Sequence, residues 1–206
     1  MYGNLFIVSA PSGAGKTSLV RAMMERLGKV AFSVSHTTRA MRPGEQEGRA
    51  YHFIDLPTFE AEIAAGAFLE YAKVFDNYYG TARASVEAQL DAGEGVFLVI
   101  DWQGAQQIRA AWPGVVSIFI LPPSRAALES RLRGRGQDSD DIIARRMQGA
   151  VSESAHYDEY DYLIINDDFP SALDELMAIV RAQRLRTSQQ ALRHADLLER
   201  LVEPTG

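Results

Sequence analysis

The chain has 206 residues, of which 47% are apolar and 23% charged, and a formal net charge of −6 at pH 7. This length suits one domain with a substantial core, and the acidic balance argues against a broad nucleic-acid-binding surface. The absence of cysteine excludes disulfides and thiolate metal sites. No basic export signal and no apolar run of about 18 residues is present, so we expect a cytoplasmic protein without membrane partners.

The first predicted element is a buried strand at residues 5–8. It runs into the loop SAPSGAGKTS (residues 9–18) and then into a helix over residues 16–27. A strand, a glycine-rich loop and a helix in this order bring free backbone N–H groups and the positive end of the helix dipole to one point. The sequence therefore predicts a phosphate-binding loop at the start of the chain.

The side chains of this loop favour a nucleoside triphosphate with Mg²⁺. Gly13 and Gly15 permit a close approach of the backbone to phosphate. Lys16 can follow the β- and γ-phosphates, and the Thr17 hydroxyl can bind the metal. Ala10 stands where the pattern GxxxxGK[ST] has its first glycine, and a methyl group is tolerated there if φ stays negative.

Residues 33–83 are richer in Thr, Tyr, Phe and turn residues, with a short helix predicted near residues 57–65. We interpret this segment as a small mixed lobe inserted into the core. Arg39 and Arg42 lie three residues apart in it, with Tyr51 soon after. Two guanidinium groups and a phenolic hydroxyl suit a phosphate dianion, although arginines in any exposed loop would give the same pattern.

Further strands are predicted at residues 96–100, 115–121 and 162–165, with helical patterns between them. Strands that alternate with helices indicate a parallel sheet with helices on both faces. The first of these strands ends in Asp101, as a Walker B strand does, and would direct a carboxylate toward the metal.

Residues 131–148, RLRGRGQDSDDIIARRMQ, predict a small arginine-rich flap. Gly134 and Gly136 break the preceding helix, and Asp138 or Ser139 can cap the next one.

The last part of the chain shows two helical patterns. The first predicts a core-packed helix from the spacing of Leu173, Leu176, Met177 and Val180. The second lies beyond Arg181 and predicts a helix on the body or on a partner, which leaves the oligomeric state open. It rests on Leu185, Leu192, Leu197, Leu198 and Leu201.

Six blocks, in family order and spanning nearly the whole chain to about Arg181, resemble the guanylate kinases, which transfer a phosphoryl group from ATP to GMP. They are APSGAGKTS, SVSHTTRAMRPGEQEGRAYHF, NYYGT, IDWQGAQQI, RLRGRG and NDD. The resemblance implies one domain, residues 1–206, with the α/β fold of the P-loop nucleoside monophosphate kinases. Its parallel-sheet core would comprise residues 1–32, 84–130 and 155–190. A mixed α/β GMP-binding lobe (33–83), a helical lid (131–154) and a C-terminal helical tail (191–206) would complete it.

The resemblance also implies which residues meet each substrate. ATP would contact Ala10, Pro11, Ser12, Gly13, Ala14, Gly15, Lys16, Thr17, Arg135 and Asn166. GMP would contact Ser35, Arg39, Arg42, Glu45, Tyr51, Glu70, Tyr79, Thr81 and Asp101. The catalytic groups would be Lys16, Arg42, Arg135 and Arg146, and Mg²⁺ would be bound by Thr17 and, through water, by Asp101.

Guanine selectivity has a chemical reason in these assignments. A Glu70 carboxylate can accept from guanine N1–H and the exocyclic amine, and a Thr81 hydroxyl can donate to O6. Adenine presents an acceptor at N1, which the carboxylate repels. The acceptor phosphate is already ionised and needs no general base, so we expect the histidines to be structural or exposed. They are His36, His52, His156 and His194.

Two positions depart from the family pattern. Val99 stands where an acidic residue is usual, on the same strand face as Asp101, so Asp101 alone would serve the metal. Gln137 replaces a common threonine, and both can donate a hydrogen bond.

Two other functions fit parts of the sequence: a catalytically silent guanylate-kinase-like module that binds proteins, and a kinase for a ribose phosphate. Intact Lys16, Thr17, Arg135 and Arg146 argue against the first. The guanine-reading residues within the lobe argue against the second. We expect ATP, GMP and dGMP as small-molecule substrates, no nucleic-acid partner, and closure of the lobes when both substrates bind.

Overall fold

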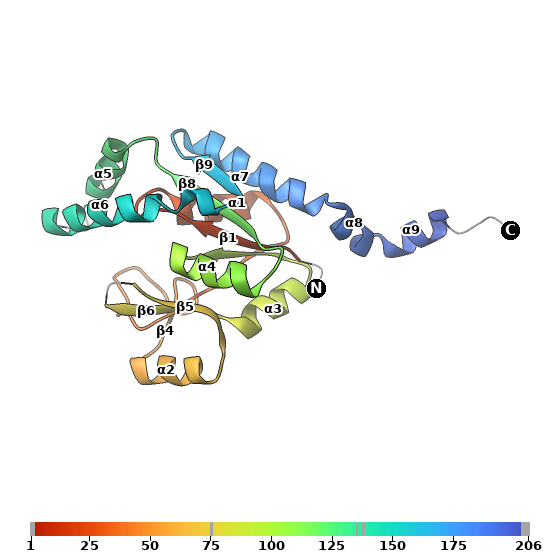
Figure 1. Cartoon of the computed structure of the whole chain (residues 1–206), viewed down its shortest axis with the longest axis horizontal. Coiled ribbons are helices and arrows are strands. Elements are labelled where there is room, and N and C mark those ends of the chain that lie inside the picture. Colours follow the sequence, from red (N-terminus) through yellow and green to blue (C-terminus); the bar gives the residue numbers. More distant parts are fainter. Residues whose placement is uncertain (1–2, 75, 135, 137–138, 203–206) are drawn as a thin grey trace.

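The computed structural model describes residues 3–74, 76–134, 136 and 139–202. Its core is a five-stranded parallel sheet in the order β2-β7-β1-β8-β9 (Figure 1). The strands are β1 (Leu5–Ser9), β2 (Val30–Phe32), β7 (Gly95–Val99), β8 (Val116–Leu121) and β9 (Tyr162–Ile165). The predicted parallel sheet is confirmed.

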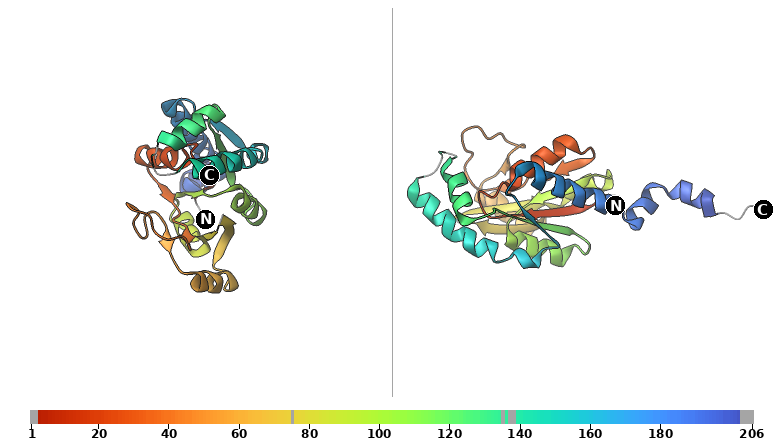
Figure 2. Two further views of the ribbon diagram at one scale, coloured as in Figure 1. Left: turned by 90° about the vertical axis from the view of Figure 1, so that its left-hand side faces the viewer. Right: turned by 90° about the horizontal axis from the view of Figure 1, so that it is seen from above.

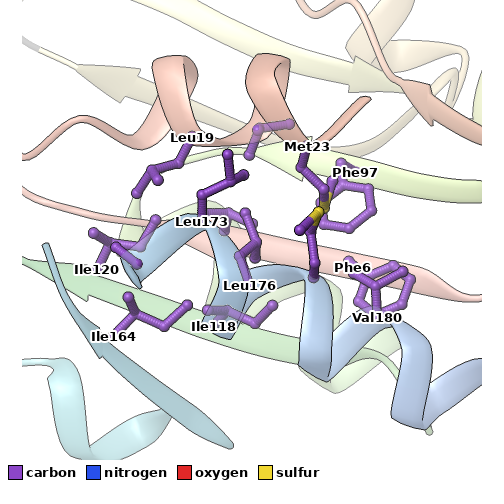
Figure 3. Packing of buried hydrophobic residues seen from close by; sticks show 14 of the residues in the cluster. Phe6, Leu19, Met23, Phe97, Ile118, Ile120, Ile164, Leu173, Leu176 and Val180 are labelled. Atoms are coloured by element: carbon purple, nitrogen blue, oxygen red, sulfur yellow. The ribbon is translucent and has the colours of Figure 1, made fainter. Parts of the chain in front are cut away.

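Helices cover both faces of this sheet, because successive side chains of a strand point to opposite faces. Phe6 and Val8 of β1 pack with α1 (Lys16–Arg26) and α7 (Phe169–Arg184). Leu5 and Ile7 pack on the other face with α3 (Arg83–Asp91) and α4 (Trp102–Ala111). Figure 3 shows the first cluster, which confirms the core helix predicted from the spacing of Leu173, Leu176, Met177 and Val180.

A second sheet, in the order β4-β3-β6-β5, forms a mixed lobe beside the core. Its strands are β3 (His36–Thr37), β4 (His52–Phe53), β5 (Phe68–Val74) and β6 (Asn77–Ala82). The helix α2 (Leu56–Ala64) packs on this sheet through the buried Phe59, whose ring stacks on Phe68 at 4.6 Å. The predicted short helix is therefore confirmed.

Two helices pack together at one end of the molecule, where the flap was predicted. The first, α5 (Arg125–Gly134), ends at the first predicted breaking glycine, and α6 (Asp140–Ser154) begins after Ser139. They join through a small apolar cluster that includes Leu132 and Ile143. A short 3₁₀ helix, η1 (Tyr157–Glu159), leads from α6 to β9. The candidate residues Arg135, Gln137 and Asp138 lie outside the described residues.

The C-terminal tail forms two helices, α8 (Thr187–Arg193) and α9 (Ala195–Val202). Figures 1 and 2 show them running away from the body of the protein. The leucines beyond Arg181 are between 41% and 71% exposed, which disfavours the first predicted alternative, that they lie on the body. The second alternative, a partner, stays a prediction. The described part of the chain contains no helix that is both long enough and apolar enough to cross a membrane.

Candidate functional site

A cleft lies between the carboxyl edge of the five-stranded sheet and the lobe. It consists of three adjoining cavities of about 650, 150 and 350 Å³. Tyr51 lines all three, and Lys16, Tyr79 and Asp101 each line both of the smaller two. Residues from both the predicted phosphate loop and the predicted lobe therefore meet around one continuous space.

The loop between β1 and α1 has the backbone of an anion-binding site. Gly13 and Gly15 have φ values of 99° and 97°, in the left-handed region that other residues avoid. Gly15 is the N-cap of α1 and has no side chain that could occupy the first N–H groups of the helix. Those N–H groups and the helix dipole are thus available to an anion in the cleft.

Lys16 lies half-buried at the centre of the cleft. Its Nζ donates a hydrogen bond to the Ile100 carbonyl oxygen at 3.2 Å, which links the start of α1 to the end of β7. Burial lowers the pKa of Lys16, whereas the nearby carboxylates of Glu153 and Asp101 oppose that shift. An anionic ligand beside Nζ would act on the ammonium in the same way as these carboxylates.

The Asp101 carboxylate and the Thr17 hydroxyl line the same cavity. Asp101 is the N-cap of α4, and its Oδ1 accepts the Gly104 N–H at 2.8 Å, which leaves Oδ2 for another partner. A hydroxyl and one carboxylate fit Mg²⁺, which usually keeps several waters and takes phosphate oxygens as further ligands. No group of three or more acidic, histidine or cysteine side chains forms a metal site among the described residues. Val99 lines the two cavities next to this position.

Asn166 braces the phosphate loop from the end of β9. Its Nδ2 donates to the Ala14 carbonyl oxygen at 2.7 Å, and a Cβ at Gly15 would collide with the same amide. The main-chain carbonyl oxygen of Asn166 in turn accepts a hydrogen bond from the Arg131 guanidinium at 2.8 Å. The Asn166 side-chain oxygen is buried and has no hydrogen-bond partner among the described residues. The residue expected to meet adenine therefore also supports the loop.

Arg39 is held by Glu45 on the lobe side of the cleft. One Arg39 nitrogen donates to both Glu45 oxygens, at 2.7 and 2.9 Å, and the guanidinium lies 5.4 Å from the Tyr51 ring centroid. The Arg42 N–H also donates to Glu45, at 2.7 Å. Burial opposes ionisation of Glu45, but these hydrogen bonds outweigh it and lower its pKa. Glu45 thus orients the arginine that the sequence assigned to phosphate.

Two further predicted phosphate ligands, Tyr51 and Tyr79, line the cleft, and their rings meet edge to face at 5.7 Å. Ser35, another predicted GMP contact, lines the same cavity. Burial raises the pKa of Tyr51, which keeps its hydroxyl protonated and able to donate. Arg42 is exposed and lines the cavity that contains Lys16.

Glu70 is a buried carboxylate, only 4% exposed, at the wall of the smallest cavity. The Thr81 hydroxyl donates to its Oε1 at 2.5 Å. Burial, together with the charge of Asp101, raises the pKa of Glu70 to about 7. Thr81 was predicted to contact a base directly, but in the structure it is fully buried and its hydroxyl is directed at Glu70.

The helix α6 contributes two side chains to the cleft, Arg146 and Glu153. The sequence prediction included only the arginine. Burial raises the pKa of Glu153, while the Lys16 charge and the Ser12 backbone N–H oppose that shift. Glu153 lies seven residues after Arg146, and this two-turn spacing places both on one helix face, a signal that was available in the sequence.

The histidines lie away from the cleft, since none is among the described residues that line its three cavities. The rings of His36 and His52 lie 4.8 Å apart in a tilted arrangement within the lobe. His156 stacks on Trp102 at 3.8 Å and hydrogen-bonds to Glu159. Their contacts agree with the structural role expected for them.

These features suit two anions in the cleft. The helix N-terminus and Lys16 suit one, and Tyr51, Tyr79 and Arg42, which lines the same cavity as Lys16, suit the other. Arg39 is paired with Glu45 and is not among the described residues that line the three cavities. The smallest cavity also has a buried acceptor, Glu70, that suits a ligand with N–H donors. This arrangement suits phosphoryl transfer between two nucleotides.

Comparisons with known proteins agree with this chemistry. The family model described as guanylate kinase matches residues 2–183. The guanylate kinase of Chromohalobacter salexigens is 62% identical over 97% of this chain and 93% of its own length. That of Pseudoalteromonas translucida is 57% identical over 98% of both chains. The crystal structure of guanylate kinase from Anaplasma phagocytophilum has a TM-score of 0.75 and 37% identity, and covers 91% of this chain and 89% of its own.

The raised pKa of Glu70 predicts a pH-dependent stability that Glu70→Gln removes. The pKa of Glu70 in the folded protein, about 7, lies above its ordinary value of 4.5, so the folded state holds this proton more tightly than the unfolded state. The resulting stabilisation is complete below pH 4.5 and is lost as the pH rises through 7. The unfolding free energy of the unaltered protein relative to Glu70→Gln should fall by about 3 kcal/mol between pH 4.5 and 8. Urea unfolding of both proteins across this range measures it. A difference that stays constant with pH would contradict the assignment.

Proposed function

This chain belongs to the guanylate kinase family, and on that basis we propose how its cleft carries out ATP:GMP phosphotransfer. The protein is an ATP:GMP phosphotransferase, which yields ADP and GDP. The observation that carries the residue assignments is the continuity of the cleft from Lys16 to Glu70. Tyr51 and Tyr79 stand between these two ends, where the phosphates of the two substrates would meet.

On the donor side, residues 10–17 hold the ATP phosphates. The free N–H groups of the first turn of α1 point into the cleft, and Lys16 supplies the positive charge for the β- and γ-phosphates. Asn166 supports this loop, and we also assign its side chain to adenine, whose amino group suits an amide oxygen. Arg135 and Arg146 of the lid neutralise the transferred group.

We assign the metal to Mg²⁺, held by the Thr17 hydroxyl and, through water, by Asp101. When bound there, it neutralises the charge on the phosphates. Because no large protein ligand set surrounds these two residues in the described chain, the ion depends on substrate phosphate for its remaining ligands.

On the acceptor side, the GMP phosphate binds Arg39, Arg42, Tyr51 and Tyr79, with Glu45 beside it, whereas Ser35 contacts the base. Glu45 fixes Arg39 in one orientation before GMP arrives, so less side-chain freedom is lost on binding. The Arg42 guanidinium reaches the cavity that contains Lys16 and can contact the phosphates of both substrates.

The base is read by Glu70, with Asp101 close to it and Thr81 supporting it. An ionised Glu70 accepts hydrogen bonds from guanine N1–H and from the exocyclic 2-amine. Its pKa of about 7 means that ionisation is incomplete at neutral pH before GMP binds, and the two donors of guanine favour the ionised form.

Catalysis consists of positioning and charge neutralisation. An oxygen of the GMP phosphate attacks the γ-phosphorus of ATP, the bond to the bridging oxygen breaks, and ADP leaves with that electron pair. Lys16, Arg42, Arg135 and Arg146 stabilise the negative charge that shifts during transfer. The acceptor oxygen is already ionised, so no proton has to be removed from it.

The silent binding module and the ribose-phosphate kinase are not favoured, because the phosphate loop, Arg146 and Glu70 all lie around one cleft.

We further propose a core, GMP-binding lobe and lid with the boundaries predicted above, and closure of the lobes on binding both substrates. We also propose dGMP as a second acceptor, because none of the assigned contacts uses the 2′-hydroxyl, and a cytoplasmic location.

Lys16→Ala tests the donor side. Removing the ammonium group should lower kcat by at least about 100-fold, because this charge acts on the phosphates during transfer. A coupled ADP-release assay with saturating ATP and GMP measures the change, and circular dichroism checks the fold. The exposed Lys73→Ala is the control and should retain normal turnover. Near-normal turnover of Lys16→Ala would refute the donor assignment.

Glu70→Gln tests the acceptor side. The amide accepts at only one atom, so it should raise KM for GMP at least about tenfold and leave KM for ATP within about twofold. Discrimination between GMP and IMP, which lacks the 2-amine, should also fall. Steady-state kinetics with each nucleotide varied in turn measure these effects, with the exposed Glu60→Gln as control. Equal changes in both KM values would show that Glu70 does not read the base.

A further inference from the structure

The outer edge of β5 is paired with a side chain from the core. β5 is an edge strand of the lobe's sheet, with β6 on one side only. On its free edge, the Tyr71 N–H donates to Gln107 Oε1 at 3.1 Å, and Gln107 Nε2 donates to the Tyr71 carbonyl oxygen at 2.8 Å. Gln107 belongs to α4, so one amide group supplies both hydrogen bonds that a neighbouring strand would otherwise give.

The residues on either side of Glu70 are therefore both attached to the core. Leu69, which precedes it, is 6% exposed and packs in the same apolar cluster as Leu98 and Ile108 beneath the five-stranded sheet. Tyr71, which follows it, is paired with Gln107. Glu70 is thus part of the lobe in sequence, but its backbone is fixed to α4 and the core on both sides.

The same face of α4 also leaves room for the Glu70 carboxylate. Gly104 lies three residues before Gln107, so both face β5. A Cβ built on Gly104 would stand 2.5 Å from Glu70 Oε2, so a side chain there would force the carboxylate to shift. The other carboxylate oxygen accepts from Thr81. The position of Glu70 is therefore defined by three contacts: Thr81, the surface of Gly104, and the Gln107 pair through Tyr71.

We infer that Gln107 is a positioning residue for guanine selectivity: with Gly104, it fixes the base-reading carboxylate of Glu70 to the core. The inference rests on the proposed role of Glu70. The attachment of Glu70 to the core separates base reading from phosphate binding within the lobe. Glu70 is attached to α4, whereas the proposed phosphate ligands Arg39, Arg42 and Tyr51 lie in the segment between β3 and β4.

The selectivity for the 2-amine depends most on this attachment. Glu70 has to face N1–H and the 2-amine of guanine at the same time, and paired hydrogen bonds of this kind are sensitive to direction. IMP offers N1–H only. A carboxylate that is free to shift therefore loses more with GMP than with IMP, whereas a general loss of stability affects both acceptors equally.

Gln107→Leu tests the inference, because leucine has a similar length and cannot pair with Tyr71. We expect kcat/KM for GMP to fall roughly 5- to 20-fold, the loss of two partly exposed hydrogen bonds, with KM for ATP within about twofold. The ratio of kcat/KM for GMP to that for IMP should fall at least about threefold. Gln106→Leu is the matched control, since the neighbouring glutamine bonds to Glu159 instead, at 3.1 Å. It should leave every parameter within about twofold.

Gly104→Ala provides a second test that leaves the Gln107 pair intact. Its Cβ displaces Oε2 of Glu70, so it should reduce the GMP-to-IMP ratio without changing KM for ATP. Equal losses for GMP and IMP in both variants would overturn the inference. Unchanged kinetics of Gln107→Leu, with discrimination lost in Glu70→Gln, would overturn it while the proposed base reader stands. Discrimination retained in Glu70→Gln would overturn both.

Discussion

Two adjacent parallel strands that end at the same edge of the sheet determine most of this site. Val8 of β1 pairs with Val99 of β7, so the residues that follow each strand leave the sheet at the same level. The loop after β1 turns into α1 and places Lys16 beside the end of β7, where its Nζ reaches the Ile100 carbonyl oxygen. The chain after β7 places Asp101 at the start of α4. A cation, a carboxylate and a helix N-terminus thus meet because of strand pairing alone.

The donor side attracts negative charge, whereas the acceptor side depends on a buried carboxylate whose own negative charge is disfavoured. Glu70 is buried near a second carboxylate, and both effects disfavour its charge. A substrate with two N–H donors compensates for that cost, whereas a base with an acceptor at the same place does not. The lobe therefore selects guanine by leaving a buried acceptor incompletely paired until the correct base arrives.

Local sequence patterns predicted the fold well because each of them is decided within a few residues. The alternating strands and helices, the glycine-rich loop and the helix ending at Gly134 all follow from backbone preferences and periodicity. The candidate residues of the phosphate loop and of the lobe could be chosen from the sequence because they lie in short motifs, and their roles stay predictions. Two tail helices replaced one, and their leucines do not pack on the body, because periodicity identifies an apolar face but not what covers it.

Contacts between distant segments could not be predicted in this way. Gln107 and Tyr71 are 36 residues apart, and their pairing depends on how α4 lies against the lobe. Glu45 was assigned to GMP, and in the structure its carboxylate binds Arg39. Thr81 was assigned to the base, and its hydroxyl is directed at Glu70. The hydrogen-bond partner of each residue is set by tertiary structure, which short motifs do not specify.

The central claim is that one cleft joins an ATP site to an acceptor site that reads guanine. Release of ADP from ATP and Mg²⁺, measured with GMP, AMP, CMP or UMP as the acceptor, tests it most directly. The account predicts rapid release with GMP and a kcat/KM at least about 1,000-fold lower with each of the other three. Release that does not depend on GMP, or that is as fast with AMP, would contradict it.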